Sequence, residues 1–103
     1  MSEIIKKNDE TIVKPAMDIV ASMAEDFKSE LLSAIDGCED KLVVDLAGVE
    51  MVDSVGLGVI IAAHNTLSQK GKKLKVINVS KDIFGLFNTM RLNRRFTVEE
   101  TAL

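Results

Sequence analysis

The residues best suited to chemistry lie in one short segment, Asp53-Ser54-Val55-Gly56-Leu57-Gly58. Asp53 and Ser54 are both helix-capping types, because a side-chain oxygen can accept a hydrogen bond from an unpaired amide of the first helical turn. Gly56 and Gly58 keep side chains away from that turn, which leaves its backbone reachable. Unpaired amides and the helix dipole favour negative charge there, so the Ser54 hydroxyl is a candidate site for a covalent phosphate.

Each of these residues also has a purely structural interpretation. Ser54 could be a plain N-cap, worth about 1 kcal/mol of helix stability. Asp53 could itself be the cap, or it could orient the Ser54 hydroxyl. Gly56 and Gly58 could allow close packing of the helix on a sheet, close approach of a partner, or both.

Two elements must position this segment. Leu42–Leu46 is apolar except for Asp45, and continuous apolarity is typical of a strand that is covered on both sides or lies near the middle of a sheet. From Ser54 to about Gln69 the apolar residues lie near one face of a helix, with Gly71 as a C-terminal stop. The segment is therefore a strand-to-helix turn, where folds of this kind place their sites.

The residues before this turn predict a hairpin and a helix. β-Branched patches at 4–5 and 11–13 flank a polar turn, which predicts two short antiparallel strands. Apolar residues recur four apart from Asp18 to Ile35, which predicts a helix. Asp18 or a neighbour is expected to cap it.

The residues after the turn predict a strand, a helix and a short strand. The strand covers Leu74–Val79, and Ser80 follows it as the cap of a third helix. Phe96–Val98 is expected to be the last strand. The residues of the third helix expected to pack inward are Ile83, Phe84, Phe87 and Met90.

This order of elements predicts an α/β fold. Strand–helix–strand units imply parallel neighbours with right-handed crossovers, and the opening hairpin adds an antiparallel pair. We therefore expect a small mixed β-sheet of about five strands, with helices packed mainly on one face.

Size and composition narrow the function. The 103 residues suit one domain spanning 1–103, and a net charge of -3 gives no electrostatic footprint for nucleic acid. Cys38 is the single cysteine, which excludes a disulfide within the chain and fits a cytoplasmic protein. The charged N-terminus lacks the apolar core of a secretory signal, and no apolar run approaches the roughly 18 residues that span a membrane. We expect no membrane insertion.

Other reactive residue types have weaker cases. His64 has no carboxylate or cysteine at ligand spacing, and Cys38 lies in a polar, acidic loop that does not favour a thiolate. Arg91, Arg94 and Arg95 could grip a phosphate or an acidic partner, although a solvated basic helix end is the simpler interpretation. We therefore expect no catalytic residue, no metal and no cofactor.

Asp53–Val59 resembles the signature of STAS domains, the domain of sulphate transporters and bacterial anti-sigma factor antagonists, which is Asp-Ser-Ser/Thr-Gly-Leu-Gly. Three flanking features are also similar to the family. They are the strand Leu42–Leu46, the entry Gly71–Val76 to the next strand, and the pair Met17-Asp18. The resemblance covers nearly the whole chain and implies a STAS-like fold.

The resemblance also implies a phosphorylation switch. In stand-alone members the serine after the aspartate, here Ser54, is phosphorylated by a partner serine kinase that is also an anti-sigma factor. The unphosphorylated protein binds this kinase and releases a sigma factor; phosphorylation ends the binding, and a serine phosphatase restores it. Val55 replaces the family's second hydroxyl residue, and Asp53 could help hold a metal bound by the kinase. The residues expected to contact the partner are Asp18, Met51, Val52, Asp53, Val55, Gly56, Leu57 and Gly58.

Two other functions stay open. Some STAS proteins are permanent subunits that brace a larger complex, such as a lipid-transport ATPase, and do not switch. A nucleotide-binding or hydrolysing domain is the third alternative, for which we expect no tight binding of ATP or GTP. Phosphate on Ser54 after incubation with a cognate kinase would distinguish the phosphorylation-switched protein from the permanent subunit.

Overall fold

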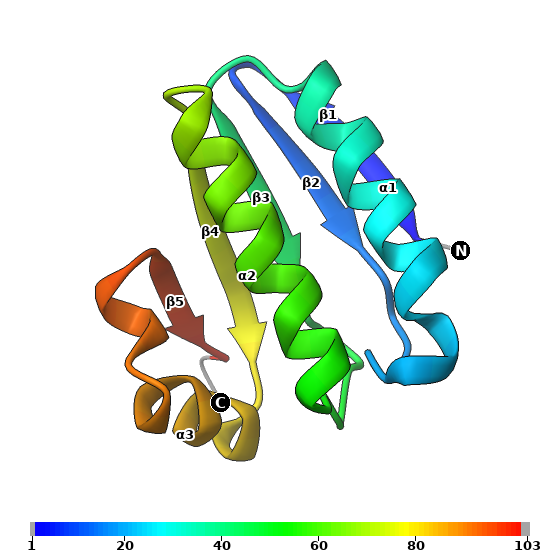
Figure 1. The fold of residues 1–103 in the computed structure, drawn as a ribbon, viewed down its shortest axis with the longest axis vertical. Helices are drawn as coiled ribbons and strands as arrows, with labels where there is room; N and C mark the ends of the chain where they lie inside the picture. The colour runs from blue at the N-terminus through cyan, green and yellow to red at the C-terminus, as the bar shows by residue number, and fades with distance from the viewer. Residues whose placement is uncertain (1, 102–103) are drawn as a thin grey trace.

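Residues 2–101, the part of the chain that the computed structural model describes, form a five-stranded mixed sheet and three α-helices. Strands lie side by side in chain order, with β1 and β2 antiparallel and the later neighbours parallel (Figure 1). The strands are β1 (Glu3–Lys7), β2 (Glu10–Lys14), β3 (Lys41–Asp45), β4 (Lys73–Val79) and β5 (Thr97–Glu100). Met1 and residues 102–103 of the domain expected over 1–103 lie outside the described residues.

The two longer helices, α1 (Ala24–Gly37) and α2 (Ser54–Gln69), lie side by side across one face of the sheet (Figure 1). The third helix, α3 (Lys81–Thr89), follows β4 and lies beside β5 at the end of the sheet. The α/β class and the mixed sheet with helices mainly on one face are thus confirmed. Within residues 2–101, no helix has both the length and the apolarity that a membrane span requires.

The core lies between this helical layer and the sheet. Val13, Val44 and Val76 are paired across β2, β3 and β4, and all three are fully buried. Alternation along a strand places them on the same face, toward α1 and α2. The largest side chains buried with them include Phe27, Leu31, Ile60 and Leu67.

The first helix begins later than expected. A 3₁₀ turn, η1 (Ala21–Met23), precedes α1, and Asp18 lies outside both. Ile19 instead pairs with Val52 in an isolated parallel bridge. Because Ile19 is fully buried in this extended pairing, long-range contact prevails here over the helical spacing of its apolar neighbours.

One expectation about packing was wrong. Met90 follows the end of α3 and is 50% exposed, because the inward face of the helix ends with the buried Phe87. Cys38 lies in the loop after α1, as expected, but its side chain is buried, and its thiol donates to the carbonyl of Ile35. Ile83 is buried and Phe84 is partly buried, as expected.

Candidate functional site

The start of α2 is capped by Asp53 and exposes Ser54. Asp53 Oδ1 accepts a hydrogen bond from the Gly56 amide at 2.8 Å, which confirms the interpretation of Asp53 as the cap. Ser54 is the first helical residue, and its side chain is exposed. With the capping role taken by Asp53, the Ser54 hydroxyl lies at the positive end of the helix dipole and can be reached from solvent.

The second oxygen of Asp53 binds a distant part of the chain. Oδ2 accepts from the Ala21 amide at 2.9 Å, so one carboxylate joins the start of α2 to the start of η1. The Gly56 amide and then the Ala21 amide hold the pKa of Asp53 below its ordinary value, because both stabilise the ionised carboxylate. Asp53 is therefore charged at neutral pH.

Asp18 fixes the backbone that leads into the site. Its Oδ1 accepts from the amides of Glu50 and Met51 at 2.9 and 3.1 Å. Beside it, the Ile19 amide donates to the Met51 carbonyl, and the Asp53 amide donates to the Ile19 carbonyl. Asp18 is thus close to the site, as expected, but it caps this bend and does not cap α1.

The two glycines have different roles. A Cβ added to Gly56 would overlap the backbone carbonyl of Ile19 and approach its Cγ2 to 2.7 Å. Gly56 therefore serves close packing of α2 on the Ile19 segment. Gly58 is exposed, and an added Cβ there would meet no atom of the described residues within 4 Å. Close approach of a partner remains an explanation for Gly58.

The residues expected to contact a partner divide by exposure. Val52 and Leu57 are buried in the core, together with Gly56, so they support the site from beneath. Met51 is 57% exposed and Val55 is 48% exposed. Exposed apolar side chains beside Ser54 are the kind of surface that a protein partner covers. The expected residues that remain accessible are Asp18, Met51, Val55 and Gly58, with Asp53 half-buried.

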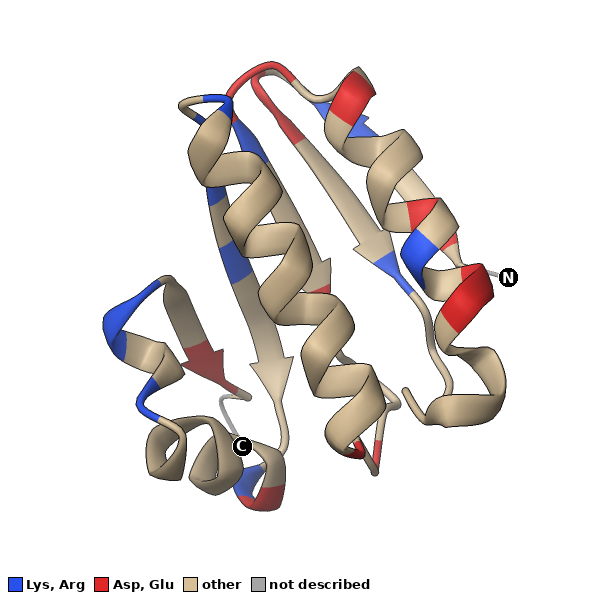
Figure 2. Ribbon diagram, in the orientation of Figure 1, with Lys and Arg blue, Asp and Glu red and all other residues tan. Residues whose placement is uncertain are grey.

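Sequence reasoning omitted two accessible neighbours of this surface. Met17 precedes Asp18 and is 45% exposed, and Glu50 precedes Met51 and is exposed. Acidic residues gather where the chain enters α2, and no Lys or Arg lies in residues 50–58 (Figure 2). The pair Met17-Asp18 was visible as a motif, but its proximity to Met51 depends on a contact between distant segments.

The other reactive residue types lie away from this site. His64 is half-buried, with its ring centroid 5.3 Å from that of Phe96. Burial raises the pKa of the Cys38 thiol, against the opposing charge of Lys72, so the thiolate is disfavoured. Among residues 2–101, no group of three or more His, Cys, Asp or Glu side chains could hold a metal ion.

A model of the STAS domain family matches residues 2–102. Among solved structures, a candidate anti-sigma factor antagonist from Thermotoga maritima is similar at a TM-score of 0.89 and 21% identity, covering 97% of this chain and 86% of that one. The Bacillus cell fate determinant SpoIIAA, in its phosphorylated form, is similar at a TM-score of 0.74 and 13% identity, and the match covers 95% of this chain and 90% of that one. A sulfate transporter family protein from Wolinella succinogenes is similar at a TM-score of 0.78 and 15% identity, and the match covers 93% of this chain and 80% of that one.

Proposed function

Because this chain belongs to the STAS domain family, we propose that it is a phosphorylation-switched binding protein whose switch is Ser54. The observation that carries the proposal is the position of Ser54, exposed on the first turn of α2 directly after its N-cap Asp53. A kinase can reach a hydroxyl there. A phosphate is tolerated there without refolding, because it projects into solvent at the positive end of the helix.

The switch acts through the surface around the serine. Before modification, Val55 and Met51 offer apolar side chains to the partner, on a backbone held by Asp18 and Asp53. A phosphate adds about -1.5 to -2 charges, and its hydration shell occupies the contact area. The Gly56 amide already donates to Asp53, so it does not replace water around the phosphate. The phosphate therefore stays hydrated, and its water opposes the apolar contact with the partner.

The partner in this proposal is a serine kinase of the anti-sigma type. The unphosphorylated chain binds it and releases a sigma factor; phosphorylation of Ser54 ends the complex, and a serine phosphatase reverses the change. The similarity to anti-sigma factor antagonists supports this role. The chain would act in the cytoplasm, by binding and without catalysis, contacting neither nucleic acid nor membrane directly.

Two substitutions of Ser54 test the switch. Ser54→Asp introduces a negative charge, and we expect it to weaken kinase binding by about tenfold or more. Ser54→Ala removes the acceptor, and we expect binding that persists in the presence of ATP and magnesium. The measurement is the affinity of each variant for the cognate serine kinase, together with mass spectrometry of the wild type after incubation with kinase and ATP.

Ser33→Asp is the matched control, since Ser33 is also an exposed helical serine but lies on α1. It should bind the kinase as the wild type does. The proposal fails if Ser54→Asp and Ser33→Asp bind equally well, or if the kinase transfers no phosphate to Ser54.

A non-switching subunit is the second candidate. The similarity to a sulfate transporter family protein favours it, because a domain of this fold also occurs there. In that case the surface around Val55 would brace a larger complex, such as a lipid-transport ATPase. The complex would then be purified intact with Ser54→Asp, and Ser54 would carry no phosphate.

A further inference from the structure

We propose that the free edge of the sheet at β1 pairs with a second copy of this chain, so that two β1 strands join antiparallel about a two-fold axis at Ile5. The five strands leave two edges, β1 and β5. All five residues of β1 are exposed, including Ile4 at 47% and Ile5 at 37%. A regular, exposed and partly apolar edge strand is a template for another strand, because its outer backbone groups have no partner in the sheet.

The backbone groups of Ile4 and Lys6 point outward from this edge. A two-residue turn joins β1 to β2, and Lys7 pairs with Glu10 across it. The pair that closes such a turn exchanges both backbone hydrogen bonds, and bonded pairs then recur at every second residue. The residues between them, Ile4 and Lys6, therefore do not bond to β2. Within residues 2–101, the backbone hydrogen bonds made outside helices and strand ladders include none from β1.

The sequence of β1 is self-complementary in one antiparallel register. With Ile5 on the two-fold axis, Ile4 of one copy pairs with Lys6 of the other, and each such pair exchanges both backbone hydrogen bonds. The same register sets Glu3 of one copy opposite Lys7 of the other, and opposite charges directly across two strands stabilise their pairing. A register moved by two residues would set Glu3 or Lys7 opposite Ile5 and leave both charges unmatched.

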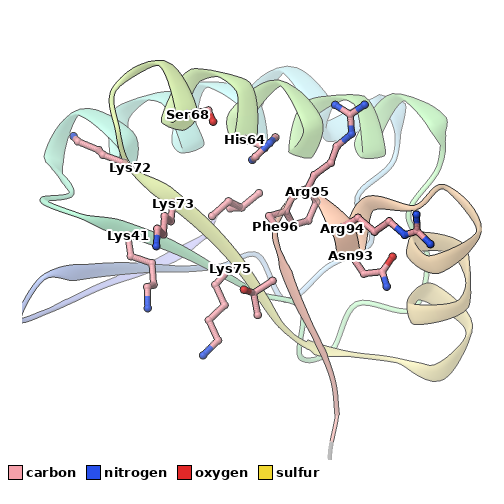
Figure 3. Close-up of a pocket in the computed structure, with 12 residues that line it drawn as sticks. Lys41, His64, Ser68, Lys72, Lys73, Lys75, Asn93, Arg94, Arg95 and Phe96 are labelled. Atoms are coloured by element: carbon pink, nitrogen blue, oxygen red, sulfur yellow. The ribbon is translucent and has the colours of Figure 1, made fainter.

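An apolar row on the open face of the sheet leads to this axis. Ile5 pairs with Ile12, and Ile12 pairs with Val43, so all three lie on the face opposite α1 and α2. Lys41 and Lys75 extend from the same face and point away from α2 (Figure 3). A second copy places its own Ile5 directly opposite the first, where the two side chains shield each other from water. The row then continues across both copies.

The helix α1 already holds β1 in shape for this contact. The Ser2 amide, just before the strand, donates to a carboxylate oxygen of Glu30 at 2.7 Å. Towards the other end, the Lys6 ammonium lies 3.2 Å from where a Cβ on Gly37 would be. Little order is therefore lost on pairing. A five-residue strand makes a smaller contact than the roughly 800 Å² per partner of stable complexes, so we expect a weak dimer that dissociates on dilution.

The opposite edge of the sheet does not extend this pairing into a fibre. β5 has four residues and ends with Glu99 and Glu100, and its register with β4 shifts between Val76 and Val79. Short length, like charges and irregular pairing are features that keep an edge strand unpaired. A two-fold contact at β1 uses the same surface on both copies, so the assembly closes after two.

The test is sedimentation velocity of the full chain at low salt, from about 10 μM to about 1 mM. We expect monomer at the low end and a growing share of dimer at the high end. A chain that stays monomeric up to about 1 mM, a free energy of about -4 kcal/mol, overturns the proposal. The edge would then be left to an extended segment of another protein.

Amide hydrogen exchange of the wild type identifies the paired edge. The amides of Ile4 and Lys6 point to solvent in the monomer, and we expect their exchange to slow as the concentration rises. The amide of Ile5 bonds to β2 in either state and should change less. A dimer that leaves the exchange of Ile4 and Lys6 unchanged would place the interface elsewhere and refute the proposal.

An exchange of charges tests the register. Lys7→Glu sets two acidic residues opposite each other across the axis, and we expect it to weaken dimerisation by about fivefold or more. Glu3→Lys with Lys7→Glu restores opposite charges there and should recover the wild-type affinity. Within one copy, Glu3 and Lys7 pair with Lys14 and Glu10, so the double variant is mismatched there at both positions. A double variant that dimerises more weakly than Lys7→Glu would assign the effect to the hairpin and contradict the register.

Lys81→Glu is the matched control, because it makes the same change of charge at an exposed position on α3. It should dimerise within about twofold of the wild type. Equal losses for Lys7→Glu and Lys81→Glu would show a general effect of net charge and refute a defined interface. These measurements need no kinase, so they stand or fall independently of the proposed switch at Ser54.

Discussion

At the scale of single residues, the candidate switch depends on Asp53. Its two oxygens accept hydrogen bonds from Gly56 and Ala21, so the side chain joins the helix that carries Ser54 to the segment that carries Asp18. The sequence predicted a capping residue, because the type and position of Asp53 are typical of an N-cap. The bond to Ala21 could not be predicted, since it joins residues 32 apart along the chain.

This geometry predicts a stability that depends on pH. The pKa of Asp53 is lowered in the folded chain. The ionised carboxylate therefore contributes fully to the stability of the fold above its unfolded pKa of about 3.9. It is lost as the pH falls through the lowered folded value. Asp53→Ala should therefore have a lower urea midpoint than the wild type at pH 7, and the difference should shrink in acid. Asp53→Asn, which keeps one acceptor and does not titrate, is the control; a difference between Asp53→Ala and wild type that is as large in acid as at pH 7 would refute this account.

At the scale of elements, the position of α2 depends on its close approach to the extended segment at Ile19. Gly56→Ala gains roughly 1 kcal/mol of helix propensity, but its Cβ would overlap the Ile19 carbonyl. Overpacking of this kind costs about 1–3 kcal/mol. Because the clash is with backbone that also bonds to Asp53, the cost should exceed the gain. We expect a net loss in the free energy of unfolding, measured by urea denaturation.

Gly58→Ala is the matched control for this prediction. It lies two residues further along the same helix, where an added Cβ meets open space among the described residues. It should gain up to about 1 kcal/mol from helix propensity. If Gly56→Ala is as stable as Gly58→Ala, close packing does not explain Gly56. If Gly58→Ala is stable but binds the kinase weakly, close approach of the partner explains Gly58.

The helices also show where sequence patterns are enough to predict the ends of an element. The bounds of α2 agree with those expected, because Asp53 caps one end and Gly71, with φ of 71°, follows the other. The signals for both ends are local. The start of α1 was placed too early because Asp18 and Ile19 bond to residues 50–53, a contact that has no local signal. Apolar spacing alone could not distinguish a helical turn from this extended pairing.

At the scale of the whole molecule, the order of the strands brings together basic residues that are distant in the sequence. Lysines at the first residues of β3 and β4 and arginines shortly before β5 lie toward the amino edge of the parallel strands, whereas the exposed serine follows the carboxyl edge of β3 (Figure 2). In the sequence the lysines near β4 and the arginines before β5 were separate basic stretches, and the arginines were interpreted as a solvated helix end. Their meeting with Lys41 depends on strand order and register, which hydrophobic patterning does not determine.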